Sequence, residues 1–173
     1  GHVERVVPGI DWGSGNLGQG LSAGVGFALA IRARGRQDHV YVLMSDGEQV
    51  KGQVAEARRI ASHHRLAGIT ALVDYNDIQI SGRTGDIMES DIPGLWRVDG
   101  WSVIECDGHD VGALSDAFDM AAAHKNRPTM IIAKTVKGKG VSFMEGNYAW
   151  HGKAVSDEDF TCAIGELGGE CDA

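Results

Sequence analysis

Residues 39–76 read HVYVLMSDGEQVKGQVAEARRIASHHRLAGITALVDYN, and this stretch decides the fold. Residues 39–45 are almost continuously apolar, which is typical of a strand buried on both faces. Residues 54–66 have the spacing of a helix, and residues 69–75 form a second apolar run. A strand, a helix and a strand in this order predict two parallel strands joined by a crossover helix.

The same alternation continues on both sides of this stretch. Further strands are expected at residues 101–106 and 129–136, and further helices at 20–34 and 111–125, the last with Asp110 as its N-cap. The pattern predicts an α/β fold in which a parallel sheet is flanked by helices on both faces. We expect residues 1–173 to form a single domain, because 173 residues is an ordinary domain length.

Two helical faces carry more specific expectations. In the helix at 54–66, Ile60 is expected on the buried side and Arg58 on the solvent side. In the helix at 20–34, Gly20, Gly24 and Ala28 share one face, so another backbone or a ligand can approach closely there. This small-residue face is interpreted as a partner surface.

Composition excludes several classes of protein. The 24 acidic side chains outnumber the 16 basic ones, which gives a net charge of −8 and disfavours nucleic acid as a partner. There is no apolar run of eighteen residues to cross a membrane, and residues 1–5 are too polar for the core of a secretory signal. The three cysteines match no zinc pattern and are consistent with reduced thiols, so a cytoplasmic protein is expected.

Glycine is over-represented, and one glycine pattern needs weighing. The chain has 25 glycines, about 14% of its residues and roughly twice the average share. Residues 13–18, GSGNLG, match the dinucleotide fingerprint, but that motif requires a strand directly before it. Pro8 and Gly9 interrupt the preceding segment, so a chance match is the better interpretation.

Polar residues follow three of the expected strands. Asp46-Gly47, Asn76 and Lys137 each stand where a strand ends, and the carboxyl ends of parallel strands meet at one edge of a sheet. Carboxylate, amide and carbonyl oxygens are the ligands that Mg²⁺ accepts, while a diphosphate and water fill its other positions. Gly47 allows its N–H to approach the diphosphate, and Lys137 can supply a positive charge. The sequence therefore predicts a site for a divalent cation and a diphosphate.

Five sequence blocks between residues 1 and 153 resemble those of transketolases and follow one another in the same order as in that family. SDGE at 45–48 followed by DYNDI at 74–78 is similar to the thiamine-diphosphate motif, an Asp-Gly with an Asn about thirty residues later. The other blocks are GH at 1–2, GNLGQG at 15–20, IAKTVKGKG at 132–140 and WHGK at 150–153.

The resemblance implies a role for individual residues. Asp46 and Asn76 are expected to bind Mg²⁺, or Ca²⁺ in its place, through their side chains, and Ile78 through its carbonyl. Other residues are expected at the thiamine diphosphate itself, namely Gly47, Asn76, Lys137 and His151 around the diphosphate, Gly15, Asn16 and Leu17 at the aminopyrimidine, and Ile80 on the thiazolium. His2, His151 and Glu56 are the expected catalytic residues, with both histidines facing the sugar and Glu56 near the interface.

The resemblance also implies an activity and a partner. A transketolase transfers a two-carbon ketol unit from a ketose phosphate to an aldose phosphate, as in pentose-phosphate metabolism. The chain is interpreted as the diphosphate-binding subunit of a two-chain enzyme, without the helical part that precedes this region in relatives. Its partner is expected to carry the pyrimidine-binding domain with the activating glutamate, and the assembly to be a dimer of heterodimers.

Other interpretations stay open. A 1-deoxyxylulose-phosphate synthase or a keto-acid dehydrogenase component would share the cofactor, although the blocks at 137–140 and 150–152 argue against both. A noncatalytic partner subunit is a third alternative, and the presence of Asp46, Asn76 and His151 argues against it. The clearest departure from the family pattern is Lys51, because relatives commonly carry a glutamate there. We expect Lys51 to pair with a carboxylate across the subunit interface.

Overall fold

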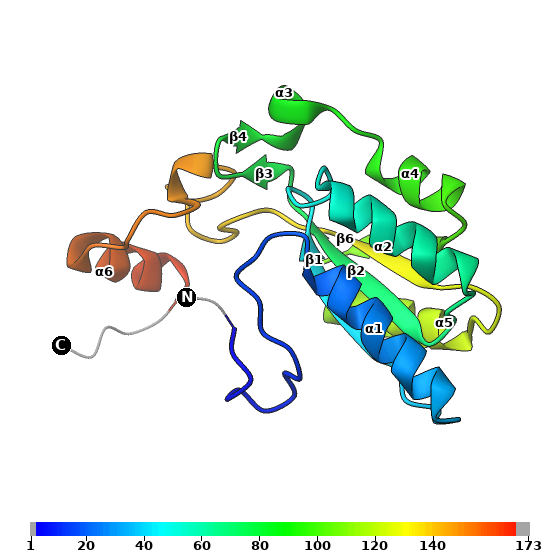
Figure 1. The fold of residues 1–173 in the computed structure, drawn as a ribbon. Coiled ribbons are helices and arrows are strands. Elements are labelled where there is room, and N and C mark those ends of the chain that lie inside the picture. The colour runs from blue at the N-terminus through cyan, green and yellow to red at the C-terminus, as the bar shows by residue number, and fades with distance from the viewer. Residues whose placement is uncertain (1–2, 169–173) are drawn as a thin grey trace.

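Four parallel strands form the central sheet of the computed structural model, which describes residues 3–168 (Figure 1). In spatial order they are β1 (Val40–Ser45), β2 (Ile69–Tyr75), β6 (Thr129–Lys134) and β5 (Ser102–Asp107). Ser45 pairs with Asp74, and Asp74 pairs with Ala133, so these strands end together at one edge. The expectation that Asp46, Asn76 and Lys137 follow strands that end at a common edge is thus confirmed.

Helices cover both faces of this sheet. α1 (Gly20–Ala33), α2 (Gly52–His63) and α4 (Ile92–Val98) pack on one face, and α5 (Val111–Ala123) packs on the other (Figure 1). The remaining elements are β3 (Ile78–Gln79), β4 (Gly82–Arg83), α3 (Thr84–Met88), the 3₁₀ helix η1 (Tyr148–Trp150) and α6 (Asp157–Glu166). The predicted α/β fold with a helix-flanked parallel sheet is confirmed, and Asp110 caps α5 by accepting from the amides of Gly112 and Ala113.

The larger part of the core lies between the sheet and the helices α1, α2 and α4. Trp96 of α4 and Trp101 are both fully buried there, with their rings edge to face and the centroids 4.5 Å apart. Their indole N–H groups are satisfied, since Trp96 donates to Gln49 Oε1 and Trp101 to the carbonyl of Arg58. A smaller cluster beneath α5 contains Ala117, Ala121 and Ile131.

The predicted orientation of α2 is wrong at two positions. Ile60 is 46% exposed, whereas Arg58 is only 3% exposed. The Arg58 guanidinium lies over the Trp96 ring, and its Nε is 2.5 Å from Asp99 Oδ2, just after α4. The reason lies in the tertiary structure, because α4 and the residue after it bring the Trp96 ring and the Asp99 carboxylate to that side of α2. These two groups compensate the buried charge of Arg58.

The small-residue face of α1 packs inside the chain. A Cβ added to Gly24 would lie 2.5 Å from Val42 Cγ2, and one added to Gly20 would lie 3.7 Å from Val42 Cγ1. Ala28 on the same face is buried. The close approach predicted for this face is therefore made to β1, and the interpretation as a partner surface is wrong.

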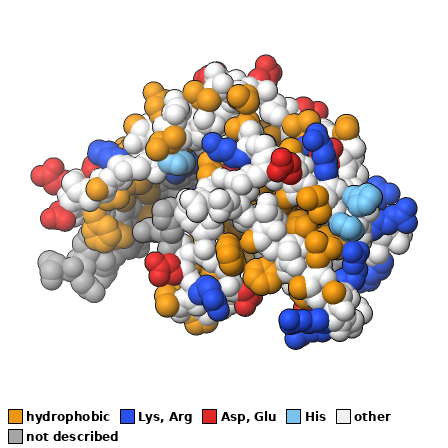
Figure 2. Space-filling view, in the orientation of Figure 1, with side chains coloured by type: hydrophobic (Ala, Val, Ile, Leu, Met, Phe, Trp, Pro, Cys, Tyr) orange, Lys and Arg blue, Asp and Glu red, His pale blue; other side chains and the backbone are white. Residues whose placement is uncertain are grey.

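Basic side chains are concentrated in one region of the surface (Figure 2), although the net charge of the chain is −8. Figure 2 shows basic and histidine side chains gathered at the end of α1 and α2, where the exposed Arg34, His63, His64 and Arg65 lie. Within residues 3–168, no helix is long and apolar enough to cross a membrane.

Candidate functional site

Asp46 is the most deeply buried acidic side chain at the carboxyl edge of the sheet. It follows β1 directly and is 1% exposed. Its Oδ2 accepts hydrogen bonds from the amides of Asn76, at 3.0 Å, and Asp77, at 2.5 Å, both just beyond β2. Its Oδ1 is buried and has no hydrogen-bond partner among the described residues. Burial raises the pKa of this carboxyl above its ordinary value, because a desolvated negative charge is unfavourable.

Asn76 lies beside Asp46 and is held in one orientation. Its Nδ2 donates to Asp74 Oδ2 at 3.1 Å, and its Oδ1 accepts from the amide of Ile78 at 3.0 Å. Asp77 between them adopts a φ of +63°, which turns the chain sharply after β2. A carboxylate oxygen and an amide oxygen are thereby brought together beside the backbone of residues 76–78.

This donor set fits a hard divalent cation. The structure contains no group of three or more His, Cys, Asp and Glu side chains that could hold a metal within residues 3–168. Magnesium does not need such a group, since it accepts one carboxylate together with amide, carbonyl, phosphate and water oxygens. The unpartnered Oδ1 of Asp46 is the kind of atom that a bound cation would satisfy.

The turn after Asp46 leaves no space for a side chain at residue 47. A Cβ on Gly47 would lie 3.0 Å from the Cβ of Gln79 in β3, so Gln79 closes this side of the turn. With hydrogen at that position, the backbone of Gly47 is free to approach a phosphate group closely. Gly47 and the Asp46–Asn76 pair therefore suit a diphosphate bound through a metal ion.

The glycine-rich loop at residues 13–19 is fixed to this turn. The amide of Gly18 donates to Glu48 Oε2 at 2.7 Å, and Gln53 Nε2 donates to the carbonyl of Leu17 at 3.1 Å. Leu17 itself is 54% exposed. Leu17 and Gly18 are thus tied to the segment that follows Asp46, although thirty residues separate Gly18 from Glu48, and Gly15 and Asn16 precede them in the same loop.

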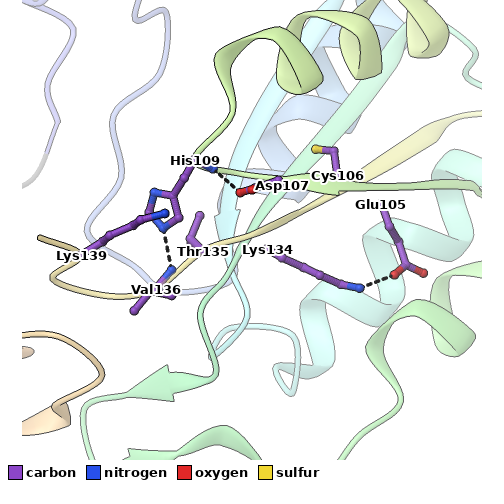
Figure 3. Close-up of a pocket in the computed structure, with 8 residues that line it drawn as sticks. All are labelled: Glu105, Cys106, Asp107, His109, Lys134, Thr135, Val136 and Lys139. Carbon is purple, nitrogen blue, oxygen red and sulfur yellow. Dashed lines mark hydrogen bonds and ion pairs between the residues drawn. The ribbon is translucent and has the colours of Figure 1, made fainter.

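The segment after β6 completes the edge. The Thr135 hydroxyl donates to Asp74 Oδ1. The amide of Val136 donates to His109 Nε2 at 2.8 Å, and Figure 3 shows this second hydrogen bond. His109 and Thr135 line a cavity of about 560 Å³ at the ends of β5 and β6, bordered also by the Lys134–Glu105 ion pair (Figure 3).

Lys137 and His151 lie close to each other. The pKa of His151 is lowered, first by burial of the ring and then by the positive charge of Lys137. The His151 side chain is exposed, and a neutral imidazole can both donate to and accept from a sugar hydroxyl.

Two predicted site residues are not part of this cluster, and a third lies outside the described residues. Glu56 is exposed on α2 and forms no hydrogen bond or ion pair within residues 3–168. Ile80 follows β3 and is 70% exposed. His2 lies outside the described residues. Their proposed roles at the thiazolium, the sugar and the interface stay predictions.

The residues that connect the cluster were missed by the sequence reasoning. Glu48 and Asp74 belong to the two motif blocks, yet no role was predicted for either of them or for Gln53 and Thr135. The available signal was that Glu48 and Asp74 stand at the ends of buried strands. An acidic side chain that is buried there needs hydrogen-bond donors from other segments, which would have indicated a connecting role.

Comparisons with known proteins agree with this geometry. The chain is 39% identical over 164 residues to the 6-deoxy-6-sulfo-D-fructose transketolase subunit SqwG of Clostridium sp. (strain MSTE9), covering 94% of this chain and 60% of the relative. It is 37% identical over 168 residues to an apulose-4-phosphate transketolase subunit of Phocaeicola vulgatus, covering 96% and 60%. The chain thus spans about 60% of the length of these relatives.

Solved structures and a family comparison lead to the same result. The crystal structure of transketolase from Campylobacter jejuni superposes with a TM-score of 0.88 at 28% identity, covering 95% of this chain and 27% of that one. The family described as "Transketolase, thiamine diphosphate binding domain" matches residues 1–172. The chain belongs to this family of transketolase thiamine-diphosphate-binding domains.

Proposed function

We propose that this chain is the diphosphate-binding subunit of a transketolase that depends on thiamine diphosphate and Mg²⁺. The proposed reaction transfers a two-carbon ketol unit from a ketose phosphate to an aldose phosphate. Relatives that are named as subunits of sugar transketolases support this function. When bound, thiamine diphosphate supplies the nucleophilic carbon that carries the ketol unit between the two sugars.

The residues of the chain have distinct tasks in this proposal. Asp46 and Asn76 hold the cation through their side chains, and Ile78 does so through its carbonyl. Gly47 donates its amide to the diphosphate, and Lys137 balances its negative charge. His151, whose pKa is lowered by partial burial and then by the charge of Lys137, hydrogen-bonds the substrate or the diphosphate.

The loop residues Gly15, Asn16 and Leu17 position the aminopyrimidine, and Ile80 packs on the thiazolium. An apolar cover over the thiazolium excludes water from the reacting carbon. His2 and Glu56 complete the proposed catalytic set, His2 at the sugar and Glu56 at the interface.

The proposed enzyme acts with a second polypeptide in the cytoplasm. That partner would carry the pyrimidine-binding domain and the glutamate that activates the cofactor, in a dimer of heterodimers. Relatives that are named as subunits rather than as whole enzymes support a partner. Ile80, Leu17 and Glu56 are exposed in this chain, which is consistent with a covering partner.

The unpartnered Oδ1 of Asp46 carries this proposal, because it is a buried acceptor beside Asn76 that needs a positive ligand. With the partner polypeptide present, the test compares the thermal unfolding of the wild type with that of Asp46→Asn, which keeps the shape and one acceptor oxygen. Mg²⁺ with thiamine diphosphate at 100 times the dissociation constant should stabilise the wild type by about 2.7 kcal/mol. An equal shift in the melting temperature of both proteins would exclude Asp46 as the metal ligand.

A further inference from the structure

Glu48 is a buried acidic side chain to which neither the motif nor the proposed function assigns a role. It is 7% exposed, and it stands two residues after Asp46. Its Oε2 accepts from the amide of Gly18 at 2.7 Å, and its Oε1 accepts from the amide of Ser45 at 2.8 Å. No lysine, arginine or histidine within residues 3–168 forms an ion pair with it.

Glu48 therefore connects two segments through main-chain donors alone. Both partners are backbone N–H groups, which can donate but never accept. Hydrogen bonds from amides to a carboxylate are stronger than those to a neutral acceptor, so the negative charge is satisfied without a counterion. The two segments are the end of β1 and the loop at residues 13–19.

These segments differ in how firmly they are held by the rest of the fold. Ser45 is paired with Asp74 in the sheet, and its carbonyl accepts from Gln49 Nε2 at 2.8 Å. Gly18 has a φ of +90° in an irregular loop whose residues 13–17 are exposed, and the other side-chain bond to this loop from α2 is the one from Gln53 Nε2 to the Leu17 carbonyl at 3.1 Å. If one bond to Glu48 is lost, the loop is the segment that should move.

We infer that Glu48 is a positioning residue that fixes the Gly15–Leu17 loop relative to the Asp46-Gly47 turn. The two hydrogen bonds of Glu48 are the basis for its effect on the loop. Its effect on cofactor binding rests in addition on the proposed function. In that function the loop holds the aminopyrimidine and the turn holds the diphosphate. Glu48 then sets the distance between the two halves of the cofactor site, and it acts without touching the cofactor.

The substitution Glu48→Gln tests the role of Glu48 at the level of the loop. Glutamine has the same shape, but its NH₂ group must face one of the two amide donors, so only one hydrogen bond survives. Amide hydrogen exchange at Gly18 should become about tenfold faster, as expected for losing a hydrogen bond to a charged group. Glu105→Gln is the matched control, because it removes a charge from β5 at the same edge without contacting this loop. Because glutamine could keep the bond to Gly18 and lose the one to Ser45, unchanged exchange at Gly18 in both Glu48→Gln and Glu48→Ala would overturn the inference.

Comparing the binding of two ligands distinguishes a positioning role of Glu48 from a general loss of structure in the variant. With Mg²⁺ and the partner polypeptide present, calorimetry is run with thiamine diphosphate and, separately, with inorganic pyrophosphate, which lacks the aminopyrimidine. Glu48→Gln should weaken thiamine diphosphate by about tenfold, the low end of the effect of outer-shell substitutions. It should leave pyrophosphate unchanged, whereas equal weakening of both ligands would overturn the positioning role.

Two further outcomes are distinguishable. If the wild type binds neither ligand with the partner polypeptide present, the proposed function fails, and the exchange measurement still decides the role of Glu48 in the loop. If Glu48→Gln does not fold, Glu48→Ala replaces it. That variant removes the conflict between donors, and it takes away both acceptor oxygens beside the cavity of about 500 Å³ that Ser45 and Glu48 border. Faster exchange at Gly18 supports the role of Glu48, and wild-type exchange contradicts it.

Discussion

Thr135 and Asp74 lie 61 residues apart in the sequence, and the hydroxyl of Thr135 donates a hydrogen bond to Asp74 Oδ1. The second oxygen of Asp74 accepts from Asn76 Nδ2 at 3.1 Å. Asp74 thus joins the end of β6 to the residue that we propose as a cation ligand. By accepting from Nδ2, Asp74 also fixes the orientation of the Asn76 amide group, so that the amide oxygen faces the amide of Ile78.

The first prediction follows from this connection. Asp74→Leu should lower the free energy of unfolding by about 1–3 kcal/mol, because the donors of Thr135 and Asn76 lose their acceptor. It should also weaken Mg²⁺ binding by about 10–100-fold, since Asn76 is no longer oriented. Asp74→Asn is the control, because its oxygen can accept from Asn76 while its NH₂ donates to the Thr135 hydroxyl. Urea denaturation and Mg²⁺ titration measure both effects, and equal losses in the two variants would contradict this role.

The second prediction concerns the lowered pKa of His151. Lys137→Met should raise this pKa, because the substitution removes a nearby positive charge that disfavours the imidazolium. Burial is the larger cause of the shift and remains, so the pKa should stay below its ordinary value. Lys139→Met is the control in the same loop. NMR titration of the His151 ring gives its pKa in the wild type and in each variant. An unchanged pKa in Lys137→Met would show that the charge of Lys137 does not act on His151.

A third prediction concerns the buried ion pair between α2 and the end of α4. Asp99→Ala should lower the free energy of unfolding by about 3–5 kcal/mol, because it leaves the Arg58 guanidinium buried without a carboxylate. The double variant Arg58→Met with Asp99→Ala should cost less than Asp99→Ala alone, since no charge is then buried. Urea denaturation of the two variants decides this, and a larger loss in the double variant would be the contrary result.

The fourth prediction uses two glycines in α1. Gly24→Ala should destabilise the chain by about 1–3 kcal/mol, since the new Cβ would lie 2.5 Å from Val42 Cγ2. Gly26→Ala should stabilise it by about 0.5–1 kcal/mol, because nothing lies within 4 Å and alanine favours the helix. Thermal unfolding of both variants measures the difference in sign. Stabilisation by both substitutions would mean that α1 does not pack tightly on β1.

The fifth prediction separates two effects of Lys51. This lysine is the exposed N-cap of α2, whose first turn contains no acidic residue. In the chain alone, Lys51→Glu should stabilise the fold by about 0.3–1 kcal/mol at low salt, because a negative charge suits the helix N-terminus. In the assembled enzyme we expect the same variant to weaken the association of the two polypeptides, and the two wild-type sites to bind thiamine diphosphate independently. Denaturation in low and high salt measures the first effect. Calorimetry of the complex measures the second, and cooperative binding with normal assembly of Lys51→Glu would contradict it.

Most of the fold could be predicted because its signals are local. The strands that end at Ser45 and Tyr75 are continuous apolar runs, and the helix between them ends at His63, three residues before the expected end at residue 66. Parallel pairing then requires that the residues after these strands meet, which places Asp46 beside Asn76. The cation site was predictable for this reason, since it depends on residue type and on strand order.

The remaining features depend on contacts between distant segments. Arg58 looks like a solvent-facing residue until α4 supplies Asp99 and the face of Trp96. Glu48 looks like a surface acid of a turn until the loop at residues 13–19 brings the amide of Gly18 to it. In both cases the burial of a charge is decided by its partner, and the partner lies thirty or more residues away.

The unsatisfied oxygen of Asp46 has a consequence for the life of the protein in a cell. A buried acceptor without a partner lowers the stability of the ligand-free chain, and a cation at that atom would remove the penalty. If the proposed ligands bind, chains without them would open more often and be degraded sooner by proteases. The amount of this protein would then follow the supply of thiamine diphosphate and magnesium, even with its synthesis held constant.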